Sequence, residues 1–225
     1  MKNFGFTLVE VLITIGVIGV VSALTIPNLI TSYQKYVTAE SLKKGYATFQ
    51  NVIRQSEDDN GDYSSWDALP TINGPVSISI FDNFINKYIA PYIEIIGTNR
   101  RTGIKSIGGV NVIYINNCHP WFYLKDGTCF TVGAFSGIHA YFTIIYDING
   151  NSGPNRYGRD IFAFRTYRNN LDGRVHGLQF GNAYIGQPQA YENDCTKENK
   201  NYDGGLSCGM IIKQNNWKIP KDYPW

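Results

Sequence analysis

FTLVEVLITIGVIGVVSALTI, residues 6–26, is apolar apart from one carboxylate, Glu10, and decides how the chain begins to fold. At about 1.5 Å of rise per residue, a helix over this stretch is roughly 31 Å long, enough to cross the hydrocarbon core of a bilayer. Ionisable groups inside such a segment are costly and usually functional, so Glu10 is a candidate functional residue. Lys2, the single charge before the span, favours a cytoplasmic start and places the remainder of the chain outside the cytoplasm.

The residues that open this stretch resemble the processing site of type IV pilins and of the pseudopilins of type II secretion systems. A short basic leader ends at Gly5 and is followed by FTLVE, residues 6–10. The resemblance implies that a prepilin peptidase cuts after Gly5 and methylates the new amine of Phe6. It also implies that Glu10 meets the N-terminal amine of a neighbouring subunit during assembly, and that Pro27 kinks the helix.

The same resemblance implies a set of partners and a location. The expected partners are identical or related pilin subunits in a filament, the prepilin peptidase, an inner-membrane assembly platform and membrane lipid. The chain is expected to be a single-pass protein of the inner membrane, with its head in the periplasm or outside the cell.

A second helical stretch continues from the membrane segment. Apolar side chains alternate at spacings of three and four, which puts them on one helical face: Ala39, Leu42, Tyr46, Phe49 and Ile53. A polar run closing on Gly61 predicts the end of the helix near residue 57. Pro27 lacks a backbone donor, so a kink or local unwinding is expected there. The stripe predicts that a globular head packs on this half of the helix.

The rest of the chain predicts an α+β head. Helical spacing covers Ile80 to Tyr88, and beyond residue 103 short runs predict strands over 110–115, 121–124, 129–132, 140–146 and 161–165. Lys125 to Thr128 predicts a tight turn between two of them, so the sheet is expected to be an antiparallel meander. The predicted organisation is a leader over 1–5, a kinked transmembrane and spine helix over 6–57, and a head over 58–225.

Four cysteines lie in the part of the chain expected outside the cytoplasm: Cys118, Cys129, Cys195 and Cys208. An even number in an oxidising compartment predicts two disulfides. Three connectivities are open, of which Cys118–Cys129 with Cys195–Cys208 closes the shortest loops. No Cys-x-x-Cys pair is present, which disfavours zinc. In the resembled pilins a C-terminal disulfide bounds a variable surface loop, which makes the 195–208 loop either an interaction surface or a simple staple.

The loop from Asp147 to Asp160 carries oxygen-bearing side chains at alternate positions, as the start of a calcium loop does. It departs from the EF-hand pattern, with Ser152 in place of the glycine and Gly158 in place of the bidentate glutamate. Loops of this composition resemble those of pseudopilin heads, some of which bind calcium. The alternatives are a Ca²⁺ site with Asp147, Asn149 and Asp160 as ligands, or a turn whose side chains bond their own backbone.

Composition and motifs limit the function classes. The net charge of +2 provides no basic field for nucleic acid. The three histidines stand in no recognisable nucleophile motif, and no enzyme is predicted. The sequence therefore predicts a structural filament subunit, as a type II secretion pseudopilin or, alternatively, as a minor type IV pilin in adhesion or DNA uptake.

Overall fold

The computed structural model describes residues 5, 7–67, 69, 78–112, 115, 119–133, 142–168, 175–180 and 193–225. The chain forms two units, Met1–Val37 and Thr38–Trp225. Helix α1 (Leu8–Asn60) contributes to both, so the division into two units falls inside the helix. The reason is burial, because the side chains of α1 enter the core of the head only from Thr38 onwards.

The first half of α1 is one uninterrupted apolar helix. By length and composition it is the one described helix suited to crossing a membrane, with a mean hydropathy of 2.3 over an 18-residue window and none of that window buried. Pro27 lies inside the helix, and helical structure continues on both sides of it, so the predicted local unwinding is absent. The Thr31 hydroxyl donates to the Pro27 carbonyl at 3.0 Å, which satisfies an oxygen near the proline.

The second half of α1 packs as its spacing predicts. All five side chains of the predicted apolar stripe are buried, each at most 6% exposed: Ala39, Leu42, Tyr46, Phe49 and Ile53. The helix ends at Asn60, and Gly61 follows with φ of 78°. That left-handed conformation is one that glycine adopts without a Cβ penalty, and the Gly61 N–H donates to the Glu57 carbonyl at 2.9 Å.

The head contains a six-stranded antiparallel sheet in which every strand pairs with its neighbour in sequence. The strands are β1 (Ile95–Arg100), β2 (Pro120–Leu124), β3 (Cys129–Gly133), β4 (Thr143–Asp147), β5 (Ile161–Arg168) and β6 (Val175–Phe180). The predicted α+β class, meander and turn at Lys125–Thr128 are confirmed. The strand predicted over 110–115 is wrong for its described residues, since Asn111 makes only an isolated bridge with Lys105.

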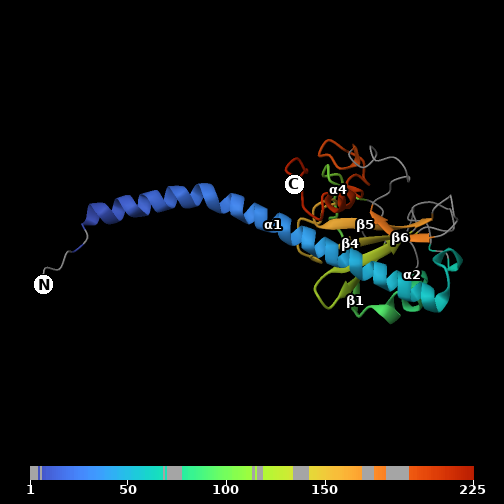
Figure 1. Ribbon diagram of the computed structural model, residues 1–225. Coiled ribbons are helices and arrows are strands. Elements are labelled where there is room, and N and C mark those ends of the chain that lie inside the picture. Colours follow the sequence, from blue (N-terminus) through green and yellow to red (C-terminus); the bar gives the residue numbers. More distant parts are fainter. Residues whose placement is uncertain are drawn as a thin grey trace. The chain divides into compact units, whose positions relative to one another are not determined.

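The sheet has a core on each face. One face turns an aromatic row toward α1, because cross-strand pairing aligns Phe122, Phe130, Tyr146 and Phe162. Figure 1 shows the second half of α1 running across strands β4 and β5. The opposite face carries a smaller cluster that includes Trp121, covered by the segment around Ile104 and by Tyr157.

Short elements close the edges of the head. They are η1 (Tyr63–Ser65), α2 (Ile78–Tyr88), η2 (Ala90–Tyr92) and α4 (Cys208–Gln214). Helix α2 agrees with the predicted helical spacing over 80–88 and buries Phe81, Phe84, Ile85 and Tyr88. The short α4 packs near β5 and β6.

Candidate functional site

The start of α1 is organised by a reciprocal pair of hydrogen bonds between Thr7 and Glu10. The backbone N–H and the hydroxyl of Thr7 both donate to Glu10 Oε2 at 2.7 Å, and the Glu10 N–H donates to the Thr7 hydroxyl at 3.3 Å. This is a capping box, in which a residue at the helix start and a glutamate three positions later satisfy each other's backbone donors. Gly5 lies before it, and Phe6 lies outside the described residues.

The capping box gives Glu10 a structural role that the sequence analysis missed. The signal was present, because a Thr followed three residues later by a Glu and then by an apolar run is a helix-start pattern. In the isolated chain the carboxylate therefore stabilises its own helix. Any test of Glu10 in assembly must separate its negative charge from its capping hydrogen bonds.

In the predicted calcium loop, Asp147 is occupied by protein donors. Arg101 Nη1 lies 2.8 Å from Asp147 Oδ2, in an ion pair whose side chains are 5% and 0% exposed. The Asn149 N–H donates to the second oxygen, Asp147 Oδ1, at 3.0 Å. Burial raises the pKa of Asp147 to about 7, although the Arg101 guanidinium favours its ionised form. A calcium ion at Asp147 would share its carboxylate with a buried guanidinium.

The other two predicted ligands also bond within the loop. Asp160 accepts from the N–H groups of Asn155 and Arg156, each at 2.7 Å, and burial raises its pKa. Asn149 Nδ2 donates to the Gly153 carbonyl at 3.2 Å, while its Oδ1 is buried without a hydrogen-bond partner among the described residues. Each oxygen of the two carboxylates thus accepts a hydrogen bond from the protein, and a Ca²⁺ site formed by Asp147, Asn149 and Asp160 stays a prediction.

Arg101 organises this side of the sheet, and no local sequence signal pointed to it. Besides Asp147, its guanidinium bonds Asn155, lies 4.6 Å from the Trp121 ring centroid and donates to Cys129 Sγ at 3.1 Å. The contacts join β2, β3, β4 and the loop before β5. One buried cation therefore fixes four segments that are distant in sequence.

Cys129 is a buried free cysteine, so the predicted Cys118–Cys129 disulfide is not formed; Cys118 itself lies outside the described residues. Burial raises the pKa of the Cys129 thiol to about 12, and the nearby Asp147 acts in the same direction. Cys129 is consequently a protonated, unreactive core residue.

The C-terminal loop is stapled and internally bonded. Cys195 and Cys208 form a disulfide across 13 residues of sequence. Just before the loop, the Asp194 carboxylate accepts from the N–H groups of Gly205 and Ser207 at 3.2 and 2.8 Å. The loop is thus held by hydrogen bonds to its backbone as well as by the disulfide.

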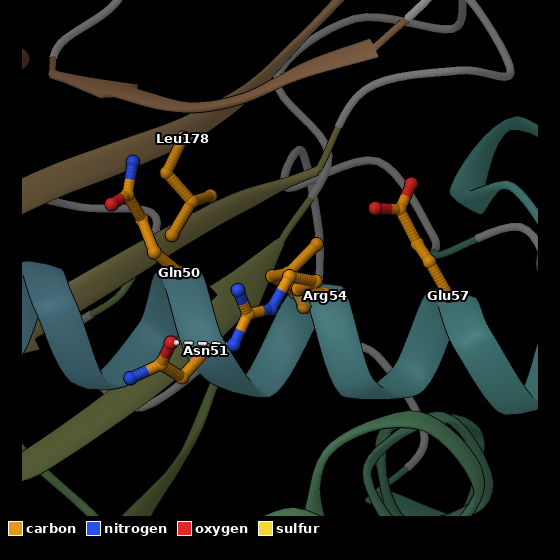
Figure 2. A pocket seen from close by; sticks show the side chains of 6 residues that line it. Gln50, Asn51, Arg54, Glu57 and Leu178 are labelled. Carbon is orange, nitrogen blue, oxygen red and sulfur yellow. Dashed lines mark hydrogen bonds between the residues drawn. The ribbon is translucent and has the colours of Figure 1, made fainter.

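A hollow of about 300 Å³ lies beside the second half of α1, against strand β6. Its lining consists of Gln50, Asn51, Ile53, Arg54, Glu57 and Leu178. Figure 2 shows Arg54 turned back along the helix toward Asn51, with Glu57 one turn further on. The Arg54–Asn51 contact is long, 3.5 Å between Nη2 and Oδ1, so the guanidinium has only a weak partner here.

Among the described residues, no cluster of three or more His, Cys, Asp or Glu side chains is arranged to hold a metal ion. His119 is buried, with Nδ1 3.1 Å from the Val132 carbonyl, and burial lowers its pKa. His119 thus takes part in packing.

Comparisons with known proteins match two successive parts of the chain. A family model described as the prokaryotic N-terminal methylation motif matches residues 1–26, and the model of a family of unknown function (DUF6613) matches residues 28–225. No curated protein and no solved structure matches the chain. The methylation motif confirms the resemblance to the type IV pilin and pseudopilin family.

Proposed function

The chain belongs to this family of unknown function (DUF6613) and begins with the methylation motif, and we propose that it is a structural subunit of a membrane-anchored, type IV-pilus-like filament. The observation that carries the proposal is the motif joined to an apolar helix whose side chains are exposed through residue 30 and beyond. Apolar surface of this extent is stable in lipid or against other helices, and not in water.

In the proposed cycle of filament assembly, this helix lies first in the membrane and then among neighbouring subunits. Before assembly, the first half of α1 crosses the inner membrane; after cleavage by the peptidase, it packs against the same half of neighbouring subunits. The head folds around the second half of α1, so it is carried along at the filament surface. Lipid and neighbouring helices are similarly apolar, which keeps the free-energy change of the transfer small enough for an assembly machine to control.

The test separates the two roles of Glu10. The variant Glu10→Ala removes both charge and cap, whereas Glu10→Gln keeps a capping-box residue and removes only the charge. We expect both variants to be cleaved and inserted, and both to fail in assembly, because a carboxylate in a low-dielectric layer favours a positive partner strongly. Filaments from each full-length variant are counted by electron microscopy. Normal assembly of both variants would refute the role of Glu10 charge.

Within this class we propose a type II secretion pseudopilin. The support is the resemblance of the loop over 147–160 to loops of pseudopilin heads, and a net charge of +2 that gives no field for DNA uptake. Deletion in the source organism tests it. Loss of a secreted protein with surface pili intact supports the pseudopilin, whereas loss of adhesion or DNA uptake with secretion intact favours the minor pilin.

A further inference from the structure

The part of α1 over residues 26–37, just before the head begins, has a single apolar face. Successive residues are about 100° apart around a helix, which places each side chain by angle. Six apolar or aromatic side chains fall within about 120° of the circumference, and each is at least 40% exposed: Ile26, Leu29, Ile30, Tyr33, Tyr36 and Val37. The other side carries the polar residues Asn28, Thr31, Ser32, Gln34 and Lys35. This segment is therefore amphipathic, whereas residues 11–25 are predominantly apolar on all sides.

The uncharged part of α1 is longer than a bilayer requires. Residues 11–34 carry no charge, and along a helix Glu10 and Lys35 are about 38 Å apart. A hydrocarbon core of about 30 Å takes only about 20 of these residues. Length and charge therefore leave two depths open: the core covers residues 6–26, with Glu10 inside it, or it covers a stretch nearer to Lys35, with Glu10 outside it.

Hydrogen bonds within the helix favour the second depth. The hydroxyls of Thr25, Thr31 and Ser32 each donate to the carbonyl four residues earlier, at 2.9–3.0 Å. Asn28 Nδ2 does the same at 3.3 Å. Donors that are bonded inside the helix enter lipid at a lower cost than donors left without a partner. The stretch up to Ser32 is therefore suited to the hydrocarbon core, and placing it there brings Glu10 out of that core.

We propose that Tyr33 and Tyr36 anchor α1 in the lipid headgroup layer on the outer side of the membrane. The proposal rests on the membrane-anchored function above and deepens it by assigning the depth of the helix. Tyrosine is enriched at this level because its ring packs beside the acyl chains while its hydroxyl stays in water. Lys35, between the two tyrosines in sequence, is the first charge after Glu10, and its long side chain can extend to the lipid phosphates.

The anchor shifts the membrane-embedded part of the helix along the sequence. With the two tyrosines at the outer boundary, the hydrocarbon core covers about residues 12–31. Its midpoint then lies near Val21, about 8 Å further along the helix than Gly16, the midpoint of residues 6–26. Glu10 lies at the inner headgroup layer, where a carboxylate remains hydrated. Before assembly, the helix thus has a polar side chain at each boundary of the bilayer.

The experiment measures the depth of α1 in the full chain, reconstituted at a low ratio of protein to lipid in vesicles of phosphatidylethanolamine and phosphatidylglycerol. Single cysteines replace residues 13–24 one at a time, in a Cys118→Ser, Cys129→Ala background, and each carries a nitroxide label. Accessibility of the label to oxygen, relative to a water-soluble nickel chelate, reports its depth. We expect the deepest label within about one residue of Val21. A maximum near Gly16 would overturn the anchor and leave the membrane-anchored function intact.

Variants of the two tyrosines test the cause of this depth. Tyr33→Ser with Tyr36→Ser removes the anchor, and we expect the depth maximum to move toward Gly16 by about one turn or more. Tyr33→Trp with Tyr36→Trp keeps two interfacial aromatic rings and should leave the maximum near Val21. Gln34→Ser is the control, because Gln34 is exposed on the polar side of the same turn. A serine variant with an unshifted maximum would overturn the anchor.

Two further outcomes separate this proposal from its alternatives. If the apolar face over residues 26–37 served a second copy of the chain, a label at residue 30 would show spin–spin broadening that persists on dilution with lipid, and the lipid anchor would be overturned. A wild-type chain that does not float with the vesicles would refute the membrane-anchored function, and the anchor with it.

Discussion

Gly45 in α1 provides a sharp test of how the helix packs on the sheet. A Cβ at this position would lie 2.2, 2.6 and 2.9 Å from three ring carbons of Tyr146, whereas non-bonded carbon atoms prefer roughly 3.5–4.0 Å. The ring cannot swing away, because Tyr146 is 2% exposed and packs against Phe49 and Phe164 at centroid distances of 5.6 and 5.7 Å. The substitution Gly45→Ala therefore overpacks the core.

Two opposing contributions set the size of the effect. Alanine is favoured over glycine inside a helix by about 1 kcal/mol. An extra carbon forced into a packed core costs about 1–3 kcal/mol, and three close ring contacts place this site at the upper end of that range. The net loss is about 1–2 kcal/mol of unfolding free energy, which for a domain of this size lowers the melting temperature by about 2–8 °C.

The assay is thermal unfolding of the fragment 28–225, which contains the whole compact unit Thr38–Trp225. The double variant Gly45→Ala with Tyr146→Leu completes a double-mutant cycle. We expect a coupling free energy of about 1 kcal/mol or more, because leucine at position 146 removes the ring atoms that the new Cβ would contact. Gly97→Ala is the control, since a Cβ there meets no atom within 4 Å. A Gly45→Ala head as stable as the wild type, or a cycle without coupling, would refute the packing argument.

Three further predictions concern the head. The disulfide Cys195–Cys208 closes a loop of about a dozen residues, so its reduction should lower the free energy of unfolding by about 3 kcal/mol in thermal melts. The control variant Cys129→Ala should lose the same amount of stability on reduction. Because the pKa of Asp147 is raised to about 7, the folded head binds this proton more tightly than the unfolded chain does. The free energy of unfolding should therefore be greatest in mild acid and decline toward neutral pH. The variant Asp147→Asn should flatten this decline. Millimolar calcium should leave the melting temperature unchanged because Arg101 occupies Asp147, and a rise that Asp147→Asn abolishes would instead show binding.

The helix and the central strands could be predicted because burial leaves a regular pattern of apolar residues in their sequences. The stripe from Ala39 to Ile53 faces one core, so its spacing of three and four follows directly from burial. Strands β2 to β4 are almost wholly buried and are rich in aromatic and β-branched residues. Strand β1 was missed because it lies at the sheet edge with nearly every residue exposed, so it shows no alternation.

The Asp147 site shows where sequence reasoning stops. The oxygen-bearing residues at alternate positions left two alternatives open, a calcium site or a turn whose side chains bond their own backbone. The partner of Asp147 is Arg101, 46 residues earlier, and nothing local links the two. Only the fold brings them together, because β2, β3 and β4 are adjacent and the chain before β2 covers their outer face.

The two halves of α1 are specified by different physics, and this bears on how subunits could find their register. In the head half, a single face is buried, so the sequence fixes rotation and depth through the stripe around Leu42 and Phe49. In the first half, lipid or neighbouring helices contact every side of the helix. Its apolar composition and its length therefore matter, and no single apolar face is required. Apolar contacts alone would let such helices slide past each other. The carboxylate of Glu10 is then a feature able to select one axial position, which is why altering its charge tests assembly more directly than altering the apolar surface.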